Sequence, residues 1–203
     1  MTSLTNSQIA PSLVPSAAPA PLRVTVISGS VRDDRMGSAV ADWVVDRVRA
    51  SGARTELIDL ADVTLPDDRH LQPGGGPRSE IADIIDRSDG FVIVTPEYNH
   101  SYPGSLKRAI DWHYGEWMFK AATVISYGAR GGLLATEHLR GVFAELHVVT
   151  TRSVVGLSAP WNHVDDSGFH APEGVDEAVD AAVTELCWWS DVLRDAREQR
   201  PFR

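Results

Sequence analysis

A loop rich in polar and aromatic side chains follows a short apolar run near the middle of the chain. The apolar run, residues 91–94, predicts a buried strand, and residues 96–111 read Pro-Glu-Tyr-Asn-His-Ser-Tyr-Pro-Gly-Ser-Leu-Lys-Arg-Ala-Ile-Asp, a loop that leads into a helix. Open α/β sheets bind ligands beyond the carboxyl ends of their strands, so this loop suits ligand binding. An ordinary strand-to-helix turn is the alternative. The candidate binding residues here are Pro96, Glu97, Tyr98 and Asn99.

A second candidate loop, residues 28–38, reads Ser-Gly-Ser-Val-Arg-Asp-Asp-Arg-Met-Gly-Ser and precedes a helical pattern. Backbone N–H groups at a helix N-terminus favour anions, and arginine offers a planar charged fork to phosphate oxygens. The loop lacks both the G-x-G-x-x-G and the G-x-x-x-x-G-K-[ST] signatures, so a monophosphate fits it better than a dinucleotide. Alternatively, the serine at its end only caps the helix and the arginines lie in solvent. The candidate phosphate ligands are Ser30, Arg32, Arg35 and Ser38.

A third loop, residues 126–132, reads Ser-Tyr-Gly-Ala-Arg-Gly-Gly and again lies between a strand pattern and a helix pattern. Its glycines let backbone amides approach a flat ligand closely. A flavin ring needs such a slot, with N–H donors near the part of the ring where negative charge develops on reduction. The candidates are Gly128, Gly131 and Gly132 for the backbone and Tyr127 for the wall.

The elements that must position these loops alternate between strand and helix patterns. Short apolar or β-branched runs predict strands at residues 22–27, 55–60, 91–95, 121–126 and 148–155. Helical spacing of apolar residues predicts helices at residues 38–50, 79–87, 104–114, 133–146 and 175–197. This order predicts an α/β fold with a parallel sheet, right-handed crossovers and helices on both faces. Residues 73–77, Pro-Gly-Gly-Gly-Pro, are expected to form a flexible loop.

The composition of the chain restricts its class. With 203 residues and 43% hydrophobic content, the chain can bury a full core, and we expect a single domain at residues 22–203 after a disordered tail at residues 1–21. The net charge of −9 argues against a nucleic-acid partner and an anionic membrane surface. The single cysteine cannot form an internal disulfide, and no His or Cys spacing suggests a metal site. We therefore expect a cytoplasmic protein without a membrane segment.

Other residues with chemical potential have structural interpretations. Trp112, Trp117 and Trp161 could cover a flat substrate, but aromatic residues near a helix end more often lie in the core or at a subunit interface, and the interface is the favoured interpretation. Cys187 lies between apolar neighbours and is expected to be a packed residue rather than a nucleophile. Residues 160–172 contain two histidines and two aspartates without a coordination spacing, so we expect a surface loop or lid rather than a metal site.

Three blocks of the chain together resemble the NADPH-dependent FMN reductase family. They are Gly29-Ser30-x-Arg32, the segment at residues 96–111, and Tyr127-Gly128-x-x-Gly131-Gly132. Each block occupies a loop expected from a flavodoxin-like sheet. The resemblance implies a flavodoxin-like doubly wound sandwich, with a five-stranded parallel sheet in the order 2-1-3-4-5 and helices on both faces.

The resemblance also implies a cofactor and a reaction. FMN would be bound non-covalently, with its phosphate on Ser30, Arg32 and the loop at residues 35–40, and its isoalloxazine ring beside residues 96–99 and 127–132. A hydride would pass from NADPH or NADH to FMN and then to a quinone, an azo compound, a metal oxyanion or free flavin, with no catalytic side chain required. A homodimer or a dimer of dimers is also implied. The further cofactor-binding candidates are Gly37, Ala39 and Val40.

Two alternative functions remain at this point. One is a flavodoxin-like carrier of single electrons, and the other is a module that binds a phosphorylated metabolite without flavin. The second and third blocks favour the enzyme. The physiological acceptor, the preference between NADPH and NADH, and the choice between dimer and tetramer stay open. Arg130 could contact the 2′-phosphate of NADPH, or it could lie free in solvent.

Overall fold

The computed structural model describes residues 20–202, in which strands and helices alternate in the predicted order. The predicted disordered tail lies almost wholly outside the described residues. The strands of the main sheet are β1 (Arg23–Ser28), β2 (Arg54–Asp59), β3 (Gly90–Pro96), β4 (Ala121–Gly128), β5 (Val149–Thr150) and β6 (Val155–Ser158). The helices are α1 (Gly37–Ala50), α2 (Ala82–Arg87), α3 (Gly104–Trp112), α4 (Leu133–Glu145) and α5 (Val175–Gln199), with 3₁₀ turns η1 (Asp68–His70), η2 (Gly115–Trp117) and η3 (Pro160–His163).

The main sheet is parallel, and its strands follow the order β2-β1-β3-β4-β5. This confirms the predicted flavodoxin-like order. The fifth position differs from the prediction because two short strands, β5 and β6, pair with the two ends of β4. The backbone N–H groups of Arg152 and Ser153 donate to the carboxylate of Glu185 on α5, at 2.7 and 3.1 Å. The fifth strand region predicted at residues 148–155 is therefore interrupted after Thr150, since a side chain takes the backbone donors there.

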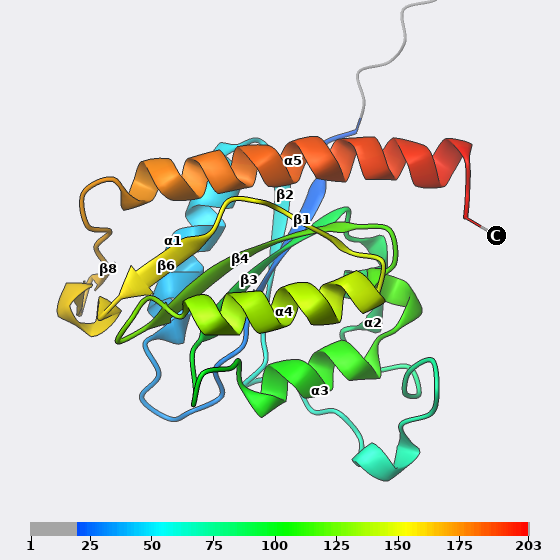
Figure 1. Cartoon of the computed structure of the whole chain (residues 1–203), viewed down its shortest axis with the longest axis horizontal. Helices are drawn as coiled ribbons and strands as arrows, with labels where there is room; N and C mark the ends of the chain where they lie inside the picture. The colour runs from blue at the N-terminus through cyan, green and yellow to red at the C-terminus, as the bar shows by residue number, and fades with distance from the viewer. Residues whose placement is uncertain (1–19, 203) are drawn as a thin grey trace, which may run out of the picture.

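Alternate residues of the central strand belong to two different hydrophobic cores. In β3, Phe91 and Ile93 pack with apolar side chains of α2, α3 and α4, whereas Val92 and Val94 pack with those of α1 and α5. All four side chains are almost completely buried, as expected for a strand with helices on both faces. Figure 1 shows α5 on one side of the strands and α3 on the other.

Two of the tryptophans predicted at a subunit interface belong instead to the interior of the chain. Trp112 and Trp117 are fully buried, and Trp117 packs between Phe91 and Phe143 with ring centroids 4.6 and 5.8 Å apart. The indole N–H of Trp112 donates to the carbonyl of Pro77 at 2.8 Å. The loop at residues 73–77, predicted to be flexible, is thus held against α3.

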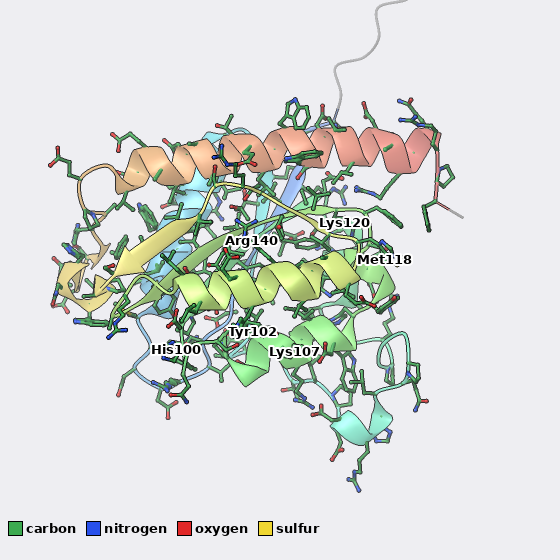
Figure 2. The ribbon with its side chains drawn as sticks, viewed as in Figure 1. His100, Tyr102, Lys107, Met118, Lys120 and Arg140 are labelled. Atoms are coloured by element: carbon green, nitrogen blue, oxygen red, sulfur yellow. The ribbon has the colours of Figure 1, made fainter. Side chains whose placement is uncertain are left out.

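The two ends of the sheet carry different chemistry. Figure 2 places His100, which follows β3, toward one end of the molecule and Lys120, which precedes β4, toward the other. Lys120 is buried, and its ammonium group donates to the carbonyls of Ile85 and Asp86, at 2.7 and 2.6 Å, at the end of α2. Burial lowers the pKa of Lys120 to about 8. At the amino-terminal end of the sheet, Lys120 therefore has a structural role, because it binds the carbonyls at the end of α2. The loops predicted to bind a ligand all lie at the carboxyl end of the sheet.

The segment predicted as a surface loop or lid contains a small hairpin of β7 (Val164–Asp165) and β8 (Gly168–Phe169). Phe169 is buried against Trp43 of α1, with ring centroids 4.9 Å apart, so one end of the segment is fixed to the body of the fold. Within residues 20–202 no group of His, Cys, Asp and Glu side chains could hold a metal ion. No helix in the same part of the chain is both long and apolar enough to span a membrane.

Candidate functional site: a pocket at the carboxyl ends of the strands

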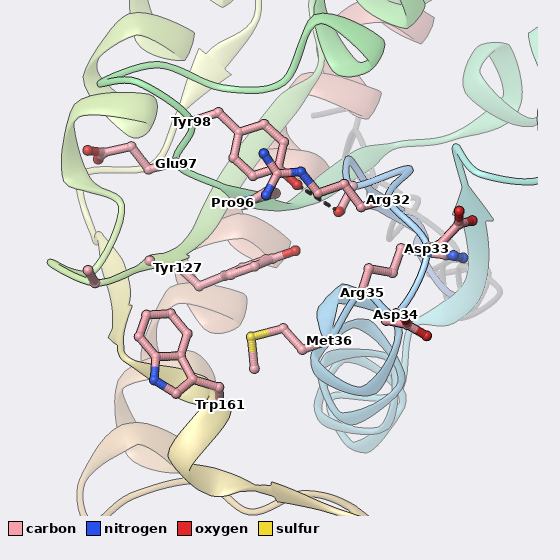
Figure 3. Close-up of a pocket in the computed structure, with 13 residues that line it drawn as sticks. Arg32, Asp33, Asp34, Arg35, Met36, Pro96, Glu97, Tyr98, Tyr127 and Trp161 are labelled. Carbon is pink, nitrogen blue, oxygen red and sulfur yellow. Dashed lines mark hydrogen bonds between the residues drawn. The ribbon is translucent and has the colours of Figure 1, made fainter.

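A pocket with a volume of about 420 Å³ lies where β1, β3 and β4 end, and all three predicted loops contribute to it. Figure 3 shows the side chains that line it. A volume of this size is within the range of small-molecule and cofactor sites. Eight predicted residues line it: Ser30, Arg32 and Arg35 from the first loop, Pro96, Glu97 and Tyr98 from the second, and Tyr127 and Gly128 from the third.

The other predicted residues lie next to this pocket without lining it. They are Gly37, Ser38, Ala39 and Val40 in the first turn of α1, Asn99 at an exposed loop tip, and Gly131 and Gly132 at the start of α4. The side chain of Val40 is fully buried in the core beneath α1. Ser38 lies inside the helix and donates its hydroxyl hydrogen to the carbonyl of Arg35 at 3.3 Å, so it is not the helix cap.

The first loop has unpaired backbone donors beside the pocket. The hydrogen bonds within residues 20–202 include none donated by the backbone N–H groups of residues 31–36. The residue before α1, Met36, makes no side-chain cap, and the first turn of α1 has no acidic side chain. The N–H groups in the first turn of α1, residues 37–39, have no acceptor within the helix, and they carry a partial positive charge that favours a bound anion.

Arg32 and Tyr98 form one wall of the pocket. The guanidinium carbon of Arg32 lies 3.9 Å from the ring centroid of Tyr98, which is a cation–π contact. The hydroxyl of Tyr98 lies 3.1 Å from that of Ser30 (Figure 3). The first and second predicted loops are therefore joined by direct side-chain contacts.

Arg35 is paired with a carboxylate and is not free in solvent. Its guanidinium donates to the carboxylate of Asp59, at the end of β2, with an N–O distance of 2.6 Å, and this partner raises the pKa of Arg35. Its Nε atom is buried and has no hydrogen-bond partner. One edge of this guanidinium is thus neutralised, and one buried donor remains to be satisfied.

The ring of Tyr127 crosses the pocket and packs against the first helix. Tyr127 is buried, and burial raises its pKa, so its hydroxyl is protonated at neutral pH. A Cβ atom added at Gly37 would lie 2.5 Å from the Tyr127 hydroxyl oxygen. Gly37 is therefore required because only a residue without a side chain admits this ring. In Figure 3 the ring of Tyr127 lies between Tyr98 and Trp161.

Glu97 joins the second loop to the third. Its backbone N–H donates to the carbonyl of Tyr127 at 2.8 Å, and its carboxylate accepts from the backbone N–H of Leu134, in the first turn of α4, at 3.1 Å. A carboxylate at a helix N-terminus is stabilised by the free N–H groups there. Both ends of Glu97 are therefore used in fixing the walls of the pocket.

The tip of the second loop is a strained two-residue turn. Tyr98 and Ser101 exchange backbone hydrogen bonds of 2.7 and 3.0 Å, and Asn99 and His100 between them have φ angles of 50° and 66°. Left-handed backbone is uncommon for residues other than glycine, although asparagine and histidine adopt it more readily than most. The hydroxyl of Ser101 lies 3.0 Å from Nδ1 of His138 on α4, which holds the turn in place. Strain of this kind is often found beside functional sites.

Some residues that line the pocket were missed among the predicted site residues. Asp33, Asp34 and Met36 belong to the first loop, between residues that were predicted, and Ala129 belongs to the third. Trp161, considered above mainly as an interface residue, comes from η3, just after β6. The first four of these residues could have been predicted, because they lie next to predicted residues in the same loops. Trp161 was also considered as a cover for a flat substrate, and the structure places it at this pocket.

Comparisons with known proteins agree with this geometry. The sequence model of a family described as NADPH-dependent FMN reductase matches residues 22–162. The chain belongs to this NADPH-dependent FMN reductase family. The match covers all three loops that build the pocket.

Individual members of this FMN reductase family are similar to this chain along most of their length. The chain is 35% identical over 155 residues to the NAD(P)H-dependent FMN reductase LOT6 of Saccharomyces cerevisiae, covering 68% of this chain and 80% of the relative. It is 35% identical over 133 residues to a quinone reductase of Escherichia coli, covering 62% and 71%. In structure it is similar to FerB, a flavoenzyme NAD(P)H:(acceptor) oxidoreductase of Paracoccus denitrificans, with a TM-score of 0.68, 26% identity, and coverage of 84% and 98%.

The residues of the pocket fit FMN, the cofactor in the name of the family. The phosphate of FMN needs several donors and a cation, and the pocket provides the free N–H groups of residues 31–36, Arg32 and the buried Nε atom of Arg35. The flat ring of FMN needs apolar and aromatic walls, which Pro96, Tyr98 and Tyr127 provide.

Proposed function

We propose that this protein binds FMN in the pocket between the three loops, takes a hydride from NADPH or NADH, and passes two electrons to a small acceptor of the quinone type. The observation that supports this most is the position of an anion-binding loop beside a flat aromatic slot in one pocket. The names of the yeast and bacterial relatives support the same activity.

Bound FMN supplies the redox chemistry, since it accepts a hydride from the nicotinamide and returns two electrons to the acceptor. The chain positions the cofactor. The N–H groups of residues 31–36 and Arg32 would hold the phosphate, and residues 96–99 and 127–132 would face the ring. The left-handed turn at Asn99 and the contacts of Glu97 fix the edge of this slot. No side chain of the chain needs to transfer a proton, because reduction of a quinone takes up its second proton from water.

The test is anaerobic reduction of the FMN-loaded protein by NADPH and by NADH, followed in a stopped-flow instrument at the flavin absorbance maximum. Rapid loss of absorbance with either donor is the expected result, and the two rates give the preference for the donor. A protein that retains FMN but is not reduced by either donor would instead be a flavodoxin-like electron carrier. A colourless protein that fails to take up FMN would be a phosphometabolite-binding module.

We also propose that the reduced protein passes electrons to other classes of small acceptor besides quinones. Azo compounds, metal oxyanions and free flavin are assayed beside quinones with the same reduced protein. The exposed Arg130 in the third loop is proposed as a contact for the 2′-phosphate of NADPH. Arg130→Ala is then expected to slow reduction by NADPH more than reduction by NADH.

Residues 22–203 are proposed to work as one domain, in a homodimer or a dimer of dimers, in the cytoplasm. Two cores that share one sheet support the single domain. Exposed apolar side chains of Tyr114, Leu133 and Leu134 on and near α3 and α4 support an assembly. Light scattering of the purified protein over a range of concentrations tests the assembly, and cell fractionation tests the location.

A further inference from the structure

Trp161 is a large apolar side chain that lies half exposed at the edge of the pocket. Its relative exposure is 54%, although it lines the pocket together with Met36 and Tyr127. In Figure 3 the indole ring, the Tyr127 ring and the side chain of Met36 lie near one another on one side of the pocket. An exposed apolar surface beside a binding site indicates a place for an apolar ligand.

The backbone that carries Trp161 is fixed to the end of the central sheet. The N–H of Ala159 donates to the carbonyl of Gly128 at 2.8 Å, and the N–H of Asn162 donates to the carbonyl of Ala159 at 3.1 Å. Ala159 has a left-handed φ of 45°, and Pro160 is buried. Because the segment is held by these contacts, the backbone that carries the indole ring is already in position before a ligand arrives, which lowers the entropy lost on binding.

The pocket separates polar from apolar groups around Tyr127. Ser30 and Arg32 lie on the Tyr98 side, where the Ser30 hydroxyl and the Arg32 guanidinium contact the Tyr98 side chain. Trp161 and Met36 lie on the other side of the Tyr127 ring (Figure 3). The phosphate site proposed above includes Arg32 on the polar side, so the apolar side is available for a second flat molecule.

We propose that Trp161 is a specificity-determining residue for the electron acceptor, and that its indole ring stacks against the flat, electron-poor ring of a quinone. The proposal rests on the proposed function. An acceptor of this class takes a hydride from the reduced cofactor and a proton from water, and leaves as the hydroquinone. Indole is the most electron-rich aromatic side chain, so it stacks well on an electron-poor ring. An acceptor without a flat face, such as ferricyanide, gains nothing from this contact.

The test compares two acceptors in the FMN-loaded protein and its variants. The protein is reduced chemically with dithionite and mixed with 1,4-naphthoquinone or with ferricyanide, so that the result does not depend on the nicotinamide reaction. Trp161→Ala is expected to raise the apparent half-saturation concentration for naphthoquinone about tenfold relative to that for ferricyanide, as loss of about 1.4 kcal/mol of stacking requires. Trp161→Phe is expected to recover most of this loss. Trp188→Ala, which removes an equally exposed tryptophan on α5, is the control and should behave as the unaltered protein.

Three results would overturn the proposal. The first is an unchanged half-saturation concentration for naphthoquinone in Trp161→Ala. The second is an equal rise for both acceptors. The third is a matching rise in the dissociation constant of FMN, which would place the indole on the cofactor instead. Failure of NADPH and NADH to reduce the unaltered protein would overturn the proposed function separately, because the acceptor reaction is measured after chemical reduction.

Discussion

Removal of the Arg32 guanidinium tests directly how the pocket binds a phosphate. Arg32→Ala deletes a cation whose guanidinium lies 3.9 Å from the Tyr98 ring centroid and which makes no ion pair within residues 20–202. The other pocket arginine, Arg35, is already paired with Asp59 at 2.6 Å and cannot fully replace the lost charge. We therefore expect weaker binding of FMN with little change in the fold.

The size of the effect follows from the kind of contact that is lost. A hydrogen bond to a charged group contributes about 1.5 to 3 kcal/mol, and Arg32 is exposed, so solvent screens part of this contribution. A loss of about 1 to 3 kcal/mol corresponds to a rise of about 5- to 150-fold in the dissociation constant. Arg32→Lys keeps the charge and loses the planar fork, so an intermediate rise is expected.

The assay is titration of the apoprotein by quenching of flavin fluorescence, with FMN and with riboflavin, which has the same ring and no phosphate. Arg32→Ala should weaken binding of FMN and leave binding of riboflavin nearly unchanged. Unaltered affinity for FMN would remove Arg32 from the phosphate site. Equal losses for both flavins would mean that Arg32 acts through the position of Tyr98 and not through the phosphate.

Two further predictions concern the fold around the pocket. Gly132→Ala should destabilise the protein by more than about 2 kcal/mol in urea unfolding, because Gly132 has a φ of 75° and a Cβ there would lie 2.7 Å from the backbone nitrogen of Tyr127. The control is Gly141→Ala in α4, where an added Cβ meets nothing within 4 Å. This variant should stabilise the protein by about 1 kcal/mol. The buried imidazole of His113 lies 2.6 Å from the Ser79 hydroxyl and 2.8 Å from the Ala109 carbonyl, and burial lowers its pKa below 6.5. Below pH 6.5 the unfolded chain therefore binds a proton at His113 that the folded chain does not. The free energy of unfolding should then fall by up to about 1.4 kcal/mol for each pH unit below pH 6.5. A His113→Gln variant with the same dependence on pH would contradict this.

Much of the fold could be predicted from the sequence because each element carries a local signal. The run around Phe91 is apolar at every position, which a strand covered on both faces requires. The alternation of strand and helix patterns then restricts the topology to a parallel sheet, because crossovers are right-handed. The predicted extent of the fifth strand was wrong for a reason that is not local in the sequence. Glu185 captures the N–H groups of Arg152 and Ser153 from 32 or more residues away.

The sequence by itself determined which loops line the pocket, since the carboxyl ends of parallel strands meet at one edge of the sheet. It could not assign partners to individual side chains. Arg35 reads as a phosphate ligand, yet it pairs with Asp59 from a neighbouring strand. Trp117 reads as an interface residue, yet it fills the core, whereas Trp161 reaches the pocket. The local sequence pattern determines each helix or strand and the loop that follows it. Contacts between residues far apart in the chain form only when the tertiary structure brings those residues together, and these contacts decided what each side chain is free to bind.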